Sequence, residues 1–405
     1  MTDASPEVVQ AAPGLRAQLV TATLARVVIN TASRMVYPFL PALSRGLGVP
    51  LESLTALLFL RGALGLAAPA IGGLPDRFGR RQTMLLGLGI FCVGLALPAL
   101  FPGWPAFVVF VVLVAASKLF FDPSLQAYLG DRTPYARRGL VIAFSELGWS
   151  GAALVGIPAV GLLMAQFDWR APFLPLAAVG LAAAAAIWFV IPNDAPARGQ
   201  AHTVAARPAV SIWRNPLVLA GLCLGLLIAM GNENLSVVYA AWLERSFGLN
   251  VAALGLSTTV IGVAELAGEG LVMGLSDRLG KRRVIGVGLV ACALSYLALP
   301  LAGGQLPLAL AGLFLVFISF EVTVVATLPL MTELEPAARG RVMTAYLAAF
   351  AAGRMLGDLT AGWLFHLGFF WVGVSSAAAS AAALVILLVF IRERRRDDFR
   401  PIMIE

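Results

Sequence analysis

The chain has 405 residues, of which 60% are hydrophobic and 13% charged, and its formal net charge is +7 at pH 7. Soluble proteins carry about 25% charged residues, so this composition excludes an ordinary soluble protein and indicates a polytopic membrane protein. The basic residues stand at the ends of apolar runs rather than along one soluble face, which argues against a nucleic-acid partner.

Twelve apolar runs follow one another along the chain. A membrane-spanning helix needs about 20 predominantly apolar residues, and each run is close to that length. The sequence therefore predicts an all-α membrane protein with twelve transmembrane helices. The expected spans are residues 19–41, 53–73, 83–101, 105–129, 140–165, 171–191, 216–243, 252–274, 284–301, 308–331, 342–367 and 370–391.

A polar break separates the second run from the third. It reads GGLPDRFGRR over residues 72–81, and a weaker copy, GLSDRLGKRR, follows at residues 274–283. The halves also match elsewhere at a nearly constant offset, since Trp169 aligns with Trp371 and Asn30 with Asn232. Two copies half a chain apart indicate an internal repeat, and we expect both breaks to be charged hairpins.

The first break resembles the signature loop of the major facilitator superfamily, through Gly72-x-Leu74-x-Asp76-Arg77-Phe78-Gly79-Arg80-Arg81. The resemblance implies two pseudo-symmetric six-helix bundles around a central cavity that opens alternately to each side of the membrane. In that family the signature Asp helps lock the halves while the outer side is open. The conformational gating motif implied here is Gly72, Asp76, Arg77, Gly79, Arg80, Arg81, Asp277 and Arg278.

Four segments are expected on this basis. The N-terminal six-helix bundle covers residues 1–191 and the C-terminal bundle covers 216–391. Between them, residues 192–215 are rich in Pro, Ala and Arg and are predicted to be a flexible cytoplasmic linker. Residues 392–405 form a basic cytoplasmic tail.

The distribution of Arg and Lys predicts the orientation. Only Arg45, Arg170 and Arg245 fall in loops on one side, whereas the other basic loop residues gather on the opposite side. Because Lys- and Arg-rich loops stay in the cytoplasm, we expect both termini there, in the plasma membrane, which is the inner membrane of a bacterium. The N-terminus lacks the basic start and cleavage site of a signal peptide, so the first run is expected to remain as a span.

Ionisable residues inside the first six spans are candidates for the transport site, because such residues are costly in hydrocarbon. Arg26, Asn30 and Arg34 are spaced four apart on one helical stripe that continues to Tyr37. The alternative is that Arg26 and Arg34 are structural partners of carboxylates elsewhere. Lys118 and Asp122 are spaced for a local i, i+4 ion pair. The predicted substrate and cavity residues are Arg26, Asn30, Arg34, Tyr37, Arg61, Lys118, Asp122, Glu146, Glu233 and Asn234.

The second half is richer in acids. Asn232-Glu233-Asn234 is expected to interrupt the seventh span, and Arg354 with Asp358 repeats the i, i+4 pairing in the eleventh. Glu265 and Glu269 share one helical face, so at least one is expected to hold a proton more readily unless a cation intervenes. The predicted proton-coupling residues are Glu265, Glu269, Glu321, Arg354 and Asp358, with a structural pairing to Arg354 as the alternative.

Other chemistries find little support in the sequence. Its two histidines, His202 and His366, lie outside any relay, and Cys92, Cys223 and Cys292 lack disulfide or metal spacing. We therefore expect no enzyme, no cofactor and no metal site.

Two further motifs bear on the kind of transport. Pro38-Phe39-Leu40-Pro41 resembles an element of twelve-helix efflux members of the superfamily. Their fifth-span antiporter signature appears only in degraded form over residues 156–161, and Lys118 stands where proton-coupled members have an Arg.

The leading hypothesis is a secondary active transporter that exports a small organic molecule by alternating access, coupled to protons. The alternatives are a symporter or facilitator for an organic anion or sugar and, from another class, a non-transporting membrane sensor. The expected partners are a small-molecule substrate, protons and the lipid bilayer, and we expect a monomer.

Overall fold

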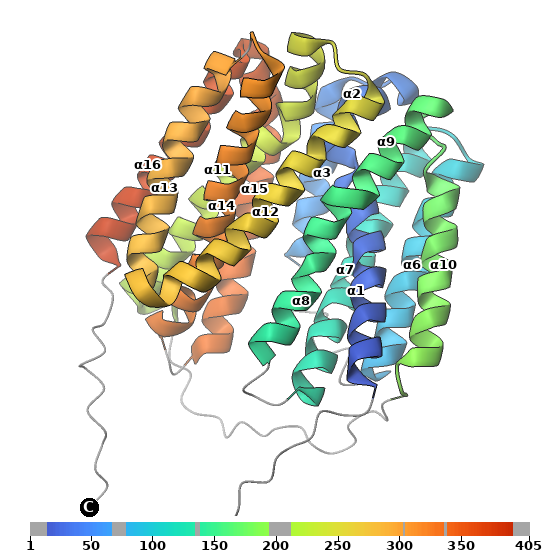
Figure 1. Ribbon diagram of the computed structural model, residues 1–405, viewed down its shortest axis with the longest axis horizontal. Coiled ribbons are helices and arrows are strands. Elements are labelled where there is room, and N and C mark those ends of the chain that lie inside the picture. Colours follow the sequence, from blue (N-terminus) through green and yellow to red (C-terminus); the bar gives the residue numbers. More distant parts are fainter. Residues whose placement is uncertain are drawn as a thin grey trace, which may run out of the picture. The chain divides into compact units, whose positions relative to one another are not determined.

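The computed structural model describes residues 14–66, 78–133, 138–193, 212–302, 304–335 and 338–391. These residues are almost entirely helical, as Figure 1 shows. They form the twelve transmembrane helices of an all-α membrane protein, arranged as two pseudo-symmetric six-helix bundles. The predicted fold class is confirmed.

The first half contains spans made of one helix and spans made of several pieces. Its elements are α1 (Leu15–Arg34), α2 (Val36–Leu47), α3 (Leu51–Gly65), α6 (Arg80–Leu100), α7 (Trp104–Arg132), α8 (Arg138–Gly151), η2 (Ala152–Gly156), α9 (Ile157–Gln166) and α10 (Phe173–Val190). The first span, predicted to end at residue 41, continues as α2 to Leu47 with Pro41 inside the helix. It ends at Gly48, whose φ of 66° favours glycine over residues with a β-carbon.

The fifth span is divided by a single turn of π-helix, η2, between α8 and α9. Pro158 follows directly and lacks the backbone N–H that an α-helix would need there. Gly156 lies against the side chain of Thr31 on α1, and a β-carbon at Gly161 would be 3.1 Å from the Cα of Gly255. The degraded glycine pattern of this span therefore serves close helix contacts.

The second half repeats this order with longer uninterrupted helices. Its elements are η3 (Ile212–Arg214), α11 (Pro216–Phe247), α12 (Val251–Leu279), α13 (Lys281–Ala298), η4 (Leu299–Ala302), α14 (Leu306–Leu334), α15 (Arg339–Leu367) and α16 (Phe369–Phe390). The α11 helix ends at Gly248, whose φ of 64° matches that of Gly48 in the first half. This shared helix end supports the internal repeat.

Two predictions about local structure are wrong in this half. Asn232-Glu233-Asn234 does not interrupt its span, because α11 is one continuous helix and these side chains find partners without a break. The second polar break is also shorter than the predicted ten-residue hairpin. Residues 274–279 continue α12, and the chain turns at Gly280, where φ is 82°.

Nine helices of the described ranges are long and apolar enough to cross a membrane by length and composition. The three remaining predicted spans do not meet these criteria of length and apolar composition, each for its own reason. In the first, α1 has 20 residues but carries polar residues such as Gln18, Arg26 and Arg34, and the described part of the second, α3, has 15 residues. The eleventh, α15, is long enough but carries Arg354 and Asp358.

The chain divides into two compact units, which are described separately below. Unit 1 takes its described residues from 1–204 and 239–263, and unit 2 takes them from 205–238 and 264–405. Within unit 1, α1 runs beside α8 and α10 (Figure 1). In unit 2, Ile212 is buried in the hydrophobic core with residues of α11, α13 and α14. Most of the predicted linker, residues 194–211, and the basic tail lie outside the described residues.

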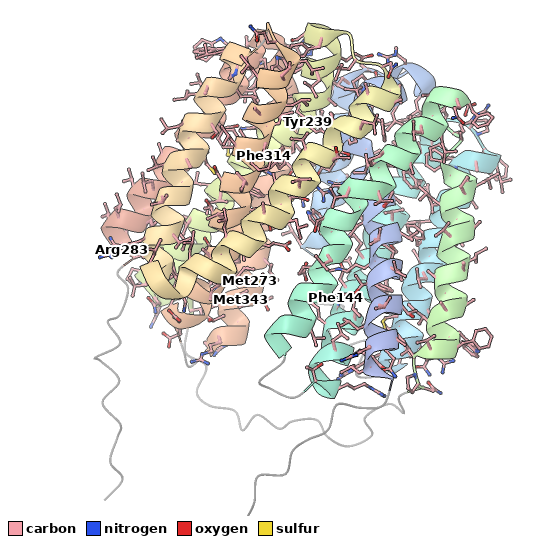
Figure 2. All side chains as sticks on the ribbon, in the orientation of Figure 1. Phe144, Tyr239, Met273, Arg283, Phe314 and Met343 are labelled. Atoms are coloured by element: carbon pink, nitrogen blue, oxygen red, sulfur yellow. The ribbon has the colours of Figure 1, made fainter. Side chains whose placement is uncertain are left out.

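Apolar side chains project from the surfaces of the helices, as the sticks in Figure 2 show. Met273 on α12 is 69% exposed and Phe144 on α8 is 38% exposed. Such surfaces are unfavourable in water but suit a lipid environment. Among the predicted site residues, Arg26 and Glu233 are buried instead between helices of their own unit.

Candidate functional site

Arg26 on α1 is the centre of a network of ionisable groups in unit 1. Its side chain is 7% exposed, and its guanidinium lies 2.8 Å from Glu146 Oε1 on α8 and 3.3 Å from Asp122 Oδ1 on α7. It also donates a hydrogen bond of 3.0 Å to the carbonyl of Ser145. The alternative reading of Arg26, a structural partner of carboxylates on other helices, therefore describes its contacts.

Lys118 completes this network. It forms the predicted i, i+4 ion pair with Asp122, at 2.9 Å. Its ammonium group also donates to Asn30 Oδ1, while Asn30 Nδ2 donates to the carbonyl of Gly148 at 3.0 Å. Two cations thus face two carboxylates, so the network is neutral when all four groups are ionised. Glu146, at 37% exposure, is its most accessible member.

Arg34 and Arg61 lie further along the first two spans and contact aromatic rings. The Arg34 guanidinium stacks 4.4 Å from the ring centroid of Trp149 and donates to the Trp149 carbonyl at 3.0 Å. Arg61 on α3 stacks 4.9 Å from the ring of Tyr37 and donates a hydrogen bond to the Tyr37 hydroxyl. Both arginines therefore make cation–π contacts.

A second ion pair joins α11 and α15 in unit 2. Arg354 Nε lies 2.8 Å from Glu233 Oε2, and Glu233 is 3% exposed. The two helices approach closely because a β-carbon at Gly357 would be 2.5 Å from that of Glu233. Glu233, predicted for the substrate cavity, and Arg354, predicted for proton coupling, are therefore direct partners.

Neighbouring polar groups are held in the same part of unit 2. Asn234 accepts a hydrogen bond of 2.6 Å from Thr360 and donates one of 3.3 Å to Ser375. Asp358 is 1% exposed on the same helix as Arg354. These contacts tie α11 to α15 and α16 around the buried Glu233 carboxylate.

Glu265 and Glu269 on α12 share a helix with Gly268, and Glu321 comes from α14. A β-carbon at Gly268 would be 2.7 Å from that of Glu321, so Glu321 packs against α12 at Gly268, which lies between the other two acids in the sequence. Glu265 is 4% exposed, whereas Glu269 and Glu321 are half-buried. In the part of the chain that the structure describes, no group of these acids is arranged to hold a metal ion.

The signature motif is only partly visible. Gly72, Asp76 and Arg77 lie outside the described residues, and Asp277 and Arg278 are described only as part of α12. Gly79 has a φ of 88° directly before α6, and its repeat partner Gly280 has a φ of 82° directly before α13. Arg80 forms an ion pair with Asp131 at the end of α7 and donates to the carbonyl of Ala127 at 2.9 Å. Arg81 stacks 4.3 Å from the ring of Trp188 on α10.

Unit 1 also contains a pocket of about 270 Å³, lined by Pro41, Ser44, Arg45, Leu51, Ala241, Glu244 and Arg245. None of the predicted substrate residues lines it. Two of its lining residues, Arg45 and Glu244, form an ion pair of 2.8 Å.

In the turn before α10, hydrogen bonds from Arg170 hold the pKa of Asp168 below its usual value, so this exposed carboxylate is ionised at neutral pH.

The sequence prediction missed several contacting residues, among them Trp149, Ser145 and Thr360. Trp149 lies one helical turn after Glu146 and is the ring on which Arg34 stacks, with Lys118 Nζ 5.7 Å from its centroid. That spacing could have indicated it, since residues i and i+3 share a helix face. The carbonyl of Ser145 and the hydroxyl of Thr360 gave no such signal, because ordinary helices contain many of both.

Comparison with known proteins agrees with this arrangement. A sequence model of the Major Facilitator Superfamily matches residues 22–230 and 221–403. The chain is 27% identical over 340 residues to the uncharacterized MFS-type transporter YceJ of Bacillus subtilis (strain 168), covering 84% of this chain and 86% of that protein. It is 28% identical over 309 residues to the multidrug resistance protein MdtG of Escherichia coli (strain K12 / DH10B), covering 72% and 73% respectively.

Solved structures share the fold at lower identity. The crystal structure of a D-xylose-proton symporter matches with a TM-score of 0.77 and 18% identity over 94% of this chain and 98% of that one. The human organic anion transporter MFSD10 (TETRAN) matches with a TM-score of 0.69 and 18% identity over 93% and 99%. With both halves matched by the family's sequence model and the paired helices repeated in each, the chain belongs to the major facilitator superfamily of membrane transporters.

Proposed function

We propose that this transporter exports a small organic molecule in exchange for protons. In this proposal it lies in the bacterial inner membrane with both termini in the cytoplasm. The relative MdtG is named a multidrug resistance protein, and one solved neighbour is a proton symporter. Those names concern other proteins, so the argument for this chain rests on its own ionisable groups.

The observation that supports proton coupling is the surplus of acids inside the spans of the second half. Glu233, Glu265, Glu269, Glu321 and Asp358 share those spans with one cation, Arg354. The structure gives Arg354 an ion pair with Glu233. Charge is costly in a medium of low dielectric constant, so five acids that share their spans with one cation are candidates to carry a proton. A carboxylate that gains and loses a proton during the cycle is what proton coupling requires.

Glu265, Glu269 and Glu321 are the proposed proton carriers. Gly268, which lies between Glu265 and Glu269 in the helix, lets Glu321 approach α12 closely, so acids from two helices come to one part of unit 2. In this scheme Arg354 and Asp358 respond to the change in charge through their positions on α15. Protons enter down their gradient while the substrate leaves, which gives the export direction.

A reconstituted transport assay tests this proposal. Inside-out membrane vesicles carrying the protein are energised to acidify their lumen and are offered ethidium, benzoate and glucose in turn. We expect proton-driven accumulation of one of these solute classes. In Glu265→Gln or Glu321→Gln, one position is permanently neutral, so accumulation fails while exchange without a pH gradient survives.

The matched control is Glu333→Gln at the end of α14, where Glu333 pairs with Lys281 and its side chain is 51% exposed. It should accumulate substrate like the wild type. Accumulation that keeps its pH dependence in both single mutants and in the double mutant would contradict the coupling assignment. If the Gln variants lose both substrate exchange and thermal stability, the acids have a structural role.

The signature motif is proposed to set the balance between the two access states. Asp76→Asn should then slow transport while leaving expression and substrate binding largely intact. Normal turnover in this variant would reduce the motif to a topology signal. For the orientation, a cysteine introduced at Gln200 should resist impermeant thiol reagents added outside intact cells, and ready labelling there would overturn it.

A further inference from the structure

We propose that the transported molecule is an organic carboxylate and that Arg61 on α3 binds its carboxylate group, beside Tyr37 and the end of α1. This inference deepens the proposed function by naming a substrate class. It starts from the charge inside the first six spans, where Arg26, Arg34, Arg61 and Lys118 face two carboxylates, Asp122 and Glu146.

The contacts separate these cations into two groups. Arg26 and Lys118 share Asp122, and Arg26 also pairs with Glu146, so the two carboxylates are used by two cations. Arg61 has a different environment. Its contacts within the described residues are to neutral groups, namely the Ser33 carbonyl at 2.9 Å and the hydroxyl and ring of Tyr37.

Arg61 lies within a predicted membrane span, where a charged side chain costs free energy. It is the eleventh residue of α3, which places it about 15 Å along the helix axis from Leu51. Its side chain is half-buried, so it retains access for a ligand. A guanidinium at membrane depth is stabilised by an anion, and its planar donor geometry matches a carboxylate in particular.

The surroundings orient Arg61 rather than neutralise it. Tyr37 is 8% exposed and holds the guanidinium from one side through both its ring and its hydroxyl. Ser33 and Tyr37 belong to the junction where α1 gives way to α2 at Met35. A guanidinium whose direction is fixed by neutral partners keeps donors available for a bidentate oxyanion.

Arg34 adds a second positive charge next to Ser33. Its guanidinium stacks on Trp149, whose ring also lies 5.7 Å from Lys118 Nζ. Aromatic rings and stacked guanidinium planes favour a flat, partly apolar body attached to the anionic group. The preferred ligand is therefore a small organic monocarboxylate with an apolar or aromatic body.

Binding is tested with the purified full-length protein in phosphatidylcholine nanodiscs at one fixed pH. The probes are benzoate, 2-naphthoate and octanoate, each compared with its uncharged amide, and the readouts are the Tm and calorimetric affinity. We expect at least one carboxylate to bind and raise the Tm while its amide does not. Arg61→Gln should weaken that binding about tenfold or more, because a charge-assisted bidentate contact is lost.

Two variants make the outcome decisive. Arg45→Gln removes another arginine of the first half, one that is 60% exposed and pairs with Glu244, and should bind like the wild type. Arg61→Lys keeps the charge without the planar donors, so it should bind more weakly than the wild type and more tightly than Arg61→Gln. If Arg61→Gln does not yield a monodisperse protein, the lysine variant is compared with the wild type alone, and equal affinities overturn the proposal.

A lipid headgroup is the other source of an oxyanion. Replacing part of the phosphatidylcholine with phosphatidylglycerol distinguishes the two. If the anionic lipid raises the Tm in an Arg61-dependent way and no carboxylate does, Arg61 is a lipid site and the substrate assignment is wrong. Absence of carboxylate binding in both lipid mixtures also overturns it. Because these measurements use no pH gradient, they can fail or succeed independently of proton coupling.

Discussion

The two halves of this transporter place opposite charges inside the membrane. The first half has four cations and two carboxylates within its spans, whereas the second has five carboxylates and one arginine. Both halves nevertheless join their first and fifth helices by an ion pair of 2.8 Å. In the first half Arg26 on α1 meets Glu146 on α8, and in the second Glu233 on α11 meets Arg354 on α15.

A glycine on the fifth helix makes room for each pair. A β-carbon at Gly148 would be 3.0 Å from that of Arg26, and one at Gly357 would be 2.5 Å from that of Glu233. The two halves therefore join the same two helices by an ion pair of reversed polarity, but at different positions along them, because the 202-residue offset aligns Glu233 with Thr31 and not with Arg26.

The largest effect is expected from Arg354→Gln. It leaves the Glu233 carboxylate, 3% exposed, without this cation, and breaking a buried pair from one side costs about 3–5 kcal/mol. Thermal unfolding in detergent should therefore show a strong loss of stability. Adding Glu233→Gln to Arg354→Gln should recover much of the lost stability. A protein in which Glu233 and Arg354 are exchanged should be more stable than a protein with either residue of the exchange substituted alone. A stable Arg354→Gln protein would show that the pair is dispensable.

Arg26→Gln breaks the ion pair between the first and fifth helices of the first half and should cost less, about 2 kcal/mol. Asp122 keeps Lys118 at 2.9 Å, and Glu146 is 37% exposed, so both carboxylates retain solvation or a partner. The same unfolding assay gives the comparison. A loss as large as that of Arg354→Gln would mean that the two pairs are energetically equivalent despite their different surroundings.

The two glycines provide a matched pair of substitutions. Gly357→Ala should destabilise the protein by about 1–2 kcal/mol, because the new methyl group meets the backbone of α11 as well as Glu233. The nearest backbone atom is the Met230 carbonyl oxygen at 3.0 Å. The three atoms nearest to a β-carbon at Gly148 are Cβ, Cγ and Cδ of Arg26, at 3.0 to 3.2 Å, and none is a backbone atom, so the effect of Gly148→Ala should be smaller. Equal Tm values for the two variants would contradict this assignment.

The smallest effect is expected from Arg45→Gln. Its partner Glu244 lies 2.8 Å away, but Arg45 is 60% exposed, and exposed ion pairs contribute less than about 1 kcal/mol. A Tm close to that of the wild type is expected at both low and high salt. A change comparable with that of Arg26→Gln would show that this contact matters more than its exposure indicates.

The sequence by itself determined the features that depend on local pattern. The apolar runs located the twelve spans, the two charged breaks revealed the repeat, and the spacing of Lys118 and Asp122 identified their ion pair. Such pairs follow from helix geometry alone, because residues four apart occupy the same helix face. Arg26 and Asn30 lie one turn apart on the predicted polar stripe of the first span, and both are buried.

The tertiary structure decided which residues on different helices are partners. It joined Arg354 to Glu233 and Arg26 to Glu146, although 121 and 120 residues separate them along the chain. It also kept α11 continuous through Glu233, where the polar residues suggested a break. A contact between helices depends on the rotation and register of both, which are set by packing at residues such as Gly148 and Gly357. One helix's own sequence pattern carries no record of its neighbour's rotation, so these partners became visible only in the folded protein.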